Sequence, residues 1–201
     1  MEERMMLRLG HAGWLAALLF LAAVAGFGVA LDGYSQLRFP VALLGAKGFP
    51  NSLAFNLLAF VLPGMLAGVV AMLLRRKLPA GAGWWLRIGS QLAFLSTLAF
   101  IAMGLLPLDP QDLESQSSRL HGTAWMLWTV AFVPAAALLG AGLFPYRNLR
   151  PYAWFCLATA AGVLLAGFVL TDFVPAGLAQ RIAFGLWFLW IAVAGRIRIG
   201  S

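Results

Sequence analysis

The chain has 201 residues, of which 62% are hydrophobic and only 10% are charged, with a formal net charge of +7. Soluble domains are nearer half apolar and a quarter charged, so this composition excludes an ordinary soluble domain and also excludes a disordered chain. Several uninterrupted apolar runs of about twenty residues predict a polytopic α-helical membrane protein. Short segments of alternating hydrophobicity are missing, which argues against a transmembrane β-barrel.

Six membrane-spanning helices are predicted along the chain. They are expected at about residues 11–31, 51–74, 84–106, 120–144, 151–171 and 180–197. No connection between them is rich enough in Ser or charge to divide the chain, so we expect a single six-helix transmembrane domain over residues 1–201. The first apolar run continues from Ala22 to Leu31 and is interpreted as a retained span rather than a cleaved signal peptide.

The basic residues predict an orientation in the membrane. Ten of the 14 Lys and Arg residues fall in the N-terminus, the second loop, the fourth loop and the C-terminus. By the positive-inside rule both termini should be cytoplasmic, and we expect a prokaryotic inner membrane. The same rule explains the basic surplus without nucleic acid as a partner. The acidic residues of the loops cluster on the opposite, outer side: Asp32, Asp109, Asp112, Glu114 and Asp172.

An internal repeat relates two segments of the chain. Residues Arg119–Trp128 align without gaps to Arg181–Trp190, and each segment follows an outer aspartate, Asp109 or Asp172, by nine or ten residues. Asp32, at the end of the first span, fits the same position in the first hairpin. We therefore predict three helical hairpins related in parallel, an arrangement that serves packing or places a ligand site at the repeat axis.

Several short motifs follow one another along most of the chain. They are Tyr34-Ser35, Gly45-Ala-Lys-Gly-Phe-Pro50, a helix with Asn56 and Gly64, Leu106-Pro-Leu-Asp109-Pro110, Leu120-His121 and Gly177-Leu-Ala-Gln180-Arg181. In their order and spacing they resemble the membrane-protein family called domain of unknown function 998. Members often carry a Ser-Glu pair in the first loop, where this chain has Ala42-Leu43. The resemblance implies a six-helix membrane protein and implies no particular reaction.

The outer side holds the candidate catalytic residues. His121 opens the fourth predicted span, where an ionisable group near lipid needs a partner. Asp109 could orient His121, as a carboxylate does in a catalytic triad, and Ser35 would complete the residue types of a nucleophilic hydrolase. No Gly-x-Ser-x-Gly motif supports that triad. A structural interpretation stays open, with His121 bound to Asp109 or to the loop and Asp109 paired with Arg119.

Further polar residues on the outer side are candidate binding residues: Asp32, Asn56, Asp172, Gln180 and Arg181. Asn56 could reach an outward-facing pocket lined by His121, but packing between helices through hydrogen bonds is the default role of such a residue. Asp172 and Arg181 could serve a ligand or form a salt bridge at a helix start. Gln180 belongs to the last motif of the family resemblance.

No metal site is predicted, because the chain has one cysteine, Cys156, and two histidines without metal-binding spacing. His11 and His121 are expected on opposite faces of the membrane, roughly 30 Å apart, so they cannot ligate one haem together. The cofactor therefore stays unknown. Ligation of a haem or a chlorophyll-type pigment by His121 alone remains open.

Three functions fit these observations. The first is an accessory or structural membrane subunit that acts through helix and lipid contacts, with other membrane subunits or further copies of the chain as partners in the bilayer. The second is an outward-facing lipid- or amphiphile-binding site, or a hydrolase or transferase, that uses Asp109 and His121. The third is a small proton-coupled transporter, which no charge at the membrane centre supports.

Overall fold

The computed structural model describes residues 9–78 and 81–197, and within them the chain is helical without strands. The helices are α2 (Ala12–Ala30), α3 (Ser52–Asn56), the π-helical segment η2 (Leu57–Val61), α4 (Leu62–Lys77), α5 (Trp84–Leu105), α6 (Gln116–Leu143), α7 (Arg150–Phe168) and α8 (Ala176–Arg196). Short 3₁₀ helices lie in the loops: η1 (Val41–Gly45), η3 (Arg147–Leu149) and η4 (Leu170–Asp172).

The six predicted spans are confirmed as helices long and apolar enough to cross a membrane, so the protein is a multi-pass membrane protein. Two helices, α6 and α8, begin four residues earlier than predicted. The fourth span begins at Gln116, because the Ser115 side chain accepts the free N–H of Ser118 and caps the helix. The sixth begins at Ala176, directly after a proline that cannot itself donate a helical hydrogen bond. His121 therefore lies in the second turn of α6 rather than at its start.

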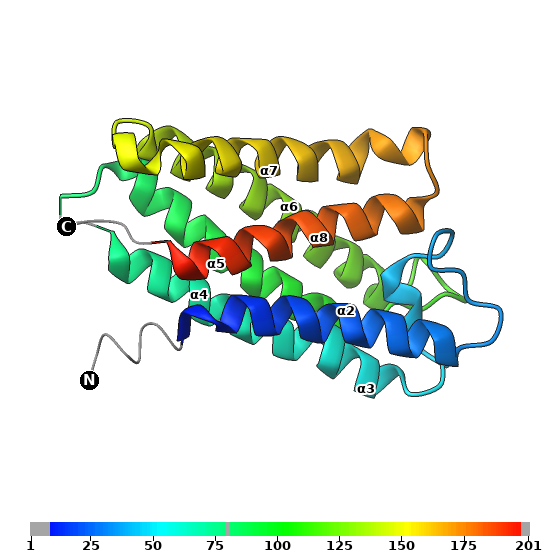
Figure 1. Cartoon of the computed structure of the whole chain (residues 1–201). Helices are drawn as coiled ribbons and strands as arrows, with labels where there is room; N and C mark the ends of the chain where they lie inside the picture. The colour runs from blue at the N-terminus through cyan, green and yellow to red at the C-terminus, as the bar shows by residue number, and fades with distance from the viewer. Residues whose placement is uncertain (1–8, 79–80, 198–201) are drawn as a thin grey trace.

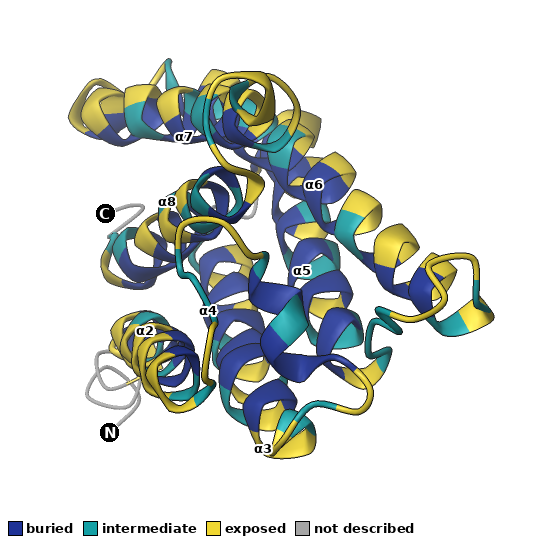
Figure 2. Ribbon diagram, turned by 90° about the vertical axis from the view of Figure 1, so that its right-hand side faces the viewer, coloured by how far each residue is buried: buried dark blue, intermediate teal, exposed yellow. Residues whose placement is uncertain are grey.

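The helices follow one another around the bundle. Each long helix packs against the next, and α8 packs against α2 and α4, so that the last helix closes against the first (Figures 1 and 2). The loops at residues 31–51, 106–115 and 169–175 lie together at one end, with α2 starting and α8 ending at the other (Figure 1). The loop end carries every acidic residue that the structure describes and is named the acidic end, and the opposite end is named the terminal end.

An aromatic cluster fills the centre of the bundle. The Phe100 ring stacks on Trp187 at 4.6 Å between centroids and meets Phe184 edge-on at 5.3 Å. Such offset and edge-to-face pairs add to the stability gained by packing large side chains. The members of the cluster come from five of the six spans: Phe20, Phe60, Phe100, Trp128, Phe184 and Trp187. Helix α7 lies outside this cluster, at the edge of the bundle (Figure 2).

The second span contains irregular backbone close to its proline. Pro63 has no N–H to donate within the helix, and the chain forms the π-helical segment Leu57–Val61 directly before it. Close to this irregular segment, glycines let α5 approach the second span closely. A Cβ at Gly64 would lie 2.6 Å from the Ile101 side chain, and a Cβ at Gly104 would lie 3.0 Å from the carbonyl oxygen of Asn56. Close packing between helices is therefore the role of these small residues.

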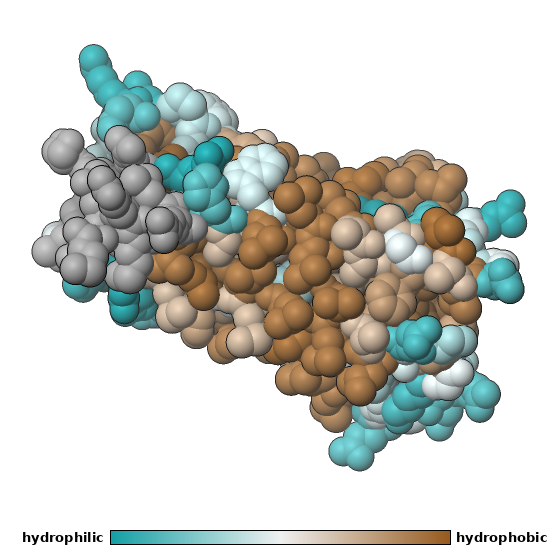
Figure 3. Space-filling model, turned by 60° about the horizontal axis from the view of Figure 1, so that its bottom comes forward, coloured by the Kyte–Doolittle hydropathy of each residue, from teal (hydrophilic) through white to brown (hydrophobic). Residues whose placement is uncertain are grey.

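The surface of the bundle matches a membrane. Figure 3 shows a broad hydrophobic band between hydrophilic side chains at both ends. The span that contains α7, Arg147–Asp172, is the least buried of the six. Its side chains are therefore the ones most available to lipid or to another membrane helix.

Candidate functional site

The first loop folds over the acidic end of α8 and is held there by Arg181. Its Nε and Nη2 donate to Gln36 Oε1 at 3.1 and 2.7 Å, and Nη2 also donates to the Tyr34 hydroxyl at 2.6 Å. Nη1 donates to the carbonyl oxygens of Phe39 at 2.9 Å and of Gly177 at 2.8 Å. A guanidinium has five N–H groups. All five are therefore used by the chain itself.

The two side chains that bind Arg181 reach further into the fold. Gln36 Nε2 donates to the carbonyl oxygen of Val24 in α2 at 2.9 Å, so the loop is tied to both α2 and α8. The Tyr34 hydroxyl donates to the carbonyl oxygen of Pro40 at 3.1 Å, and the Arg181 Cζ lies 5.8 Å from the centroid of the Tyr34 ring. Burial raises the pKa of Tyr34 above its ordinary value despite the neighbouring guanidinium. The phenol is therefore protonated near neutral pH and able to donate.

The start of α8 provides two more contacts to the first loop. Gln180 Oε1 accepts the backbone N–H of Val41 at 2.7 Å, and the N–H of Leu178 donates to the carbonyl oxygen of Leu37 at 2.9 Å. A Cβ at Gly177 would lie 2.8 Å from that same oxygen, closer than side-chain atoms approach. Glycine at this position lets the loop backbone pack directly on the helix.

Asn56 is a second point of attachment for the first loop. Its side chain is buried, and Nδ2 donates to the carbonyl oxygen of Gly45 at 2.8 Å. Gly45 has no room for a side chain, because a Cβ there would collide with the Asn56 amide. No hydrogen bond joins Asn56 to His121 in the described chain, since each binds backbone carbonyl oxygens instead.

The loop between α5 and α6 is organised by Ser118. Its hydroxyl accepts the N–H of Asp109 at 3.0 Å and lies 2.9 Å from the carbonyl oxygen of Asp112, to which it can donate. The first loop touches this segment through Lys47, whose N–H donates to the carbonyl oxygen of Leu108 at 2.8 Å. The Lys47 ammonium also lies 3.8 Å from Asp109 Oδ2. Both large loops of the acidic end are thus joined.

The His121 side chain binds carbonyl oxygens at the end of α5. Its Nδ1 lies 3.1 Å from the carbonyl oxygen of Met103 and 2.9 Å from that of Leu106. Four residues after Met103 comes Pro107, which has no N–H to bond the Met103 carbonyl. The imidazole therefore supplies a donor that the helix lacks. Because both partners are acceptors, Nδ1 carries the proton, and Nε2 is the nitrogen able to accept a proton or bind a metal.

The three candidate catalytic residues are not hydrogen-bonded to one another among the residues that the structure describes. The Ser35 hydroxyl accepts the N–H of Arg38 at 3.4 Å, and Asp109 Oδ1 accepts the N–H of Gln111 at 3.2 Å. With His121 bound to α5 carbonyls, the arrangement lacks the nucleophile–base and base–carboxylate contacts of a triad.

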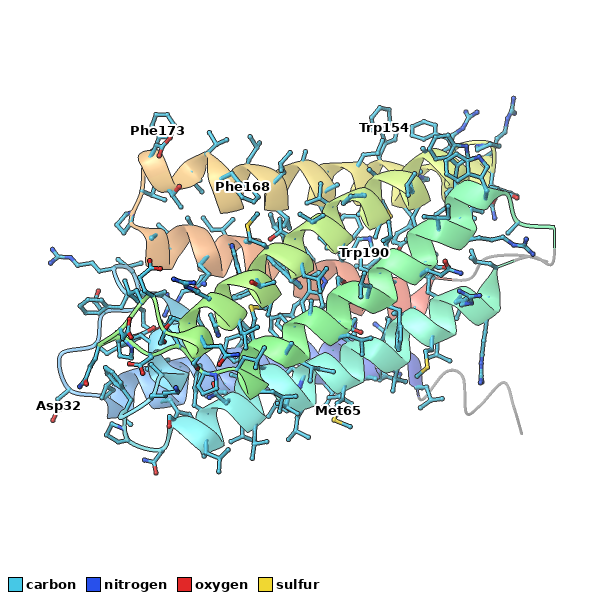
Figure 4. All side chains as sticks on the ribbon, turned by 180° about the vertical axis from the view of Figure 1, so that it is seen from behind. Asp32, Met65, Trp154, Phe168, Phe173 and Trp190 are labelled. Atoms are coloured by element: carbon cyan, nitrogen blue, oxygen red, sulfur yellow. The ribbon has the colours of Figure 1, made fainter. Side chains whose placement is uncertain are left out.

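The two expected salt bridges are also absent from the described residues. Arg119 pairs with Glu114 at 3.0 Å on the exposed surface instead of with Asp109. Arg181 is saturated by the first loop, so it is not available to Asp172. Asp32 and Asp172 are exposed, and Asp32 projects from the loop at the acidic end (Figure 4).

Within residues 9–78 and 81–197, no group of three or more His, Cys, Asp and Glu side chains could hold a metal ion. Cys156 is buried and accepts the indole N–H of Trp190 at 3.2 Å.

Sequence reasoning missed two residues that organise the acidic end, Gln36 and Ser118. A local signal existed for the neighbouring cap Ser115, because serine before an apolar helical run is a frequent capping residue, but it did not identify the loop contacts of Ser118. No local signal pointed to Gln36, whose partner Arg181 is 145 residues away along the chain.

Comparison with known proteins gives a family and nothing closer. No curated protein and no solved structure matches the chain. The model of the family described as Protein of unknown function (DUF998) matches residues 14–197, which include all six spans almost entirely. The protein is therefore a member of this family of unknown function.

Proposed function

We propose that the protein is an accessory or structural subunit of a membrane assembly and acts through contacts of its helices. The observation that carries this proposal is the saturation of Arg181, whose five N–H groups all bind the protein's own chain. Asn56 and Gln180 are likewise bound to backbone groups of the first loop. These three polar residues of the acidic end thus stabilise the first loop.

The surface proposed for partner contact is the outer face of α7. Its exposed residues recur at helical spacing and form one stripe: Trp154, Ala158, Ala161, Leu165 and Phe168. Figure 4 shows Trp154 and Phe168 pointing away from the bundle, whereas Trp190 points into it. Two alanines at the centre of the stripe would allow the backbone of another helix to approach closely, as small residues do in membrane interfaces.

The orientation and location belong to the same proposal. The Lys and Arg residues of the terminal end support a cytoplasmic position for both termini in a prokaryotic inner membrane. The acidic end would then face outward, and α7 would lie in the bilayer with its stripe available to a partner subunit. No catalytic role is proposed, because no hydrogen bond joins Ser35, Asp109 and His121 in the described chain.

Native mass spectrometry of the gently extracted protein tests the proposal. We expect a complex of fixed stoichiometry with a different membrane protein, which the double variant Ala158→Leu/Ala161→Leu dissociates because the added side chains hold the helices apart. The matched control is Ala22→Leu/Ala25→Leu on the exposed face of α2, which should leave the complex intact. A chain that runs alone with lipid, or an assembly that the α7 variant does not change, would refute the proposal.

A further inference from the structure

An open groove of about 470 Å³ lies at the acidic end, where α5 ends and α6 begins. Its apolar wall includes Leu105 and Leu120, which are 62% and 41% exposed. Its polar wall includes Lys47, Gln116 and Ser117. Because Leu105 is the last residue of one span and Gln116 is the first of the next, the groove lies at the level of the lipid headgroups.

Two opposite charges face each other beside this groove without a hydrogen bond. The Lys47 ammonium and the Asp109 carboxylate are 3.8 Å apart, beyond the range of a direct bond. Lys47 is about half exposed and Asp109 about a quarter, with side-chain values of 48% and 26%. No hydrogen bond and no further ion pair of the Lys47 ammonium occurs in the described part of the chain. Both groups therefore keep hydrogen-bonding capacity for a ligand that carries both charges.

We propose that this groove binds the headgroup of a zwitterionic phospholipid, specifically one with a phosphoethanolamine headgroup. The Lys47 ammonium pairs with the phosphate, and the Asp109 carboxylate accepts N–H bonds from the primary ammonium of the lipid. The acyl chains descend along Leu105 and Leu120 into the bilayer. This inference is independent of the accessory role proposed above, because it concerns another surface and another ligand.

The charges select this headgroup over the other common ones. A phosphoglycerol headgroup brings only negative charge to a region that already holds Asp109 and Asp112. A phosphocholine headgroup carries both charges, but its quaternary ammonium has no N–H to donate to a carboxylate. Only the primary ammonium provides a charge-assisted hydrogen bond to Asp109 together with a phosphate for Lys47.

The test is a lipid titration of the whole, delipidated protein in detergent, read by native mass spectrometry. Short-chain lipids with phosphoethanolamine, phosphocholine and phosphoglycerol headgroups are compared, together with soluble glycerophosphoethanolamine. We expect one phosphoethanolamine lipid to bind at least about fivefold more tightly than the other two lipids. The soluble headgroup should bind much more weakly, because it does not contact the leucine wall.

Two variants test the roles of the two charges separately. Lys47→Gln should weaken all phosphate lipids, whereas Asp109→Asn should remove the preference for ethanolamine over choline. The matched control Arg119→Gln removes a cation that does not line the groove and should leave both affinities unchanged. Melting temperatures without added lipid establish that each variant is folded. Equal binding of all headgroups, tighter phosphoglycerol binding, or an equal effect of the control would overturn the proposal.

Discussion

Replacing Arg181 by Met should release the first loop from the acidic end while the six-helix bundle stays folded. Methionine keeps an apolar stem of similar length but removes the guanidinium and its five hydrogen bonds. Gln36 and the carbonyl oxygen of Phe39 then lose their charged donor. The equivalent residue of the internal repeat, Arg119, provides the matched control, because its one ion pair with Glu114 is on the surface.

The size of the effect follows from the number and environment of the bonds. Hydrogen bonds to a charged group contribute about 1.5–3 kcal/mol each when they are shielded from water. At a half-exposed site the lost bonds are partly replaced by hydrogen bonds to water, so the loss is smaller. We therefore expect Arg181→Met to destabilise the docked loop by about 2–4 kcal/mol. Arg119→Met should cost less than about 1 kcal/mol, since exposed ion pairs contribute little.

Hydrogen exchange of the protein in nanodiscs measures this difference directly. The N–H of Val41 donates to the Gln180 side chain of α8, a bond that depends on the docked loop. Its exchange in Arg181→Met should accelerate roughly thirtyfold to several-hundredfold, whereas core amides of α5 keep their protection. Equal exchange in Arg181→Met and Arg119→Met would refute the reasoning, because it would mean that the five bonds do not hold the loop.

Three further predictions concern single positions. Gly177→Ala should weaken loop docking by about 1–3 kcal/mol, whereas Gly185→Ala, whose added methyl meets nothing within 4 Å, should not, and hydrogen exchange of the first loop compares the two. Since its folded-state pKa is raised, Tyr34 contributes stability that is complete below pH 10.0 and is lost as pH rises through the higher folded value. Alkaline unfolding curves of Tyr34→Phe should therefore be flatter than those of the wild type, and parallel curves would contradict this. In a variant without the native thiol, Gln111→Cys should react with an impermeant reagent in intact cells and Asn148→Cys only after lysis, and the reverse pattern would invert the orientation.

The sequence predicted the spans because their signal is local. Each apolar run is long enough to cross a bilayer, and the structure confirms helices at all six. The predicted starts of two helices were wrong because the residue before the helix, Ser115 or Pro175, determines where it begins, rather than the start of the apolar run. The candidate site was less predictable. His121 and Arg181 were identified as polar residues near lipid that need partners, but their partners are backbone carbonyls and distant side chains that no local pattern encodes.

The internal repeat illustrates this limit. Trp128 and Trp190 occupy the same position in the two repeated segments, and both are fully buried. Arg119 and Arg181 are equivalent as well, yet Arg119 binds a neighbouring carboxylate at the surface and Arg181 binds a loop from the other end of the chain. The difference arises because the first loop lies over α8. Repeated sequence thus predicted equivalent packing but could not predict which long loop each arginine meets.

Polar contacts fasten α8 to its neighbours at both ends of the bundle. In a bilayer, apolar surfaces gain little by leaving lipid for one another, so close backbone approach and hydrogen bonds must hold helices together. At the acidic end, Arg181 ties α8 to the first loop. At the terminal end, Lys77 Nζ donates to the carbonyl oxygens of Gly195 at 2.9 Å and Ile197 at 3.0 Å.

Glycines let the first and last spans, α2 and α8, pack closely against each other. A Cβ at Gly13 would lie 2.7 Å from the carbonyl oxygen of Ile191, and a Cβ at Gly10 would lie 2.6 Å from that of Gly195. The backbones of α2 and α8 therefore touch without side chains between them near the terminal end. Among the long helices that the structure describes, α7 packs mainly on α6 and α8, and the hydrogen bond from Trp190 to Cys156 joins it to α8. The chain thus fixes α8 at both ends and leaves one face of α7 open, which is the face proposed to meet a partner.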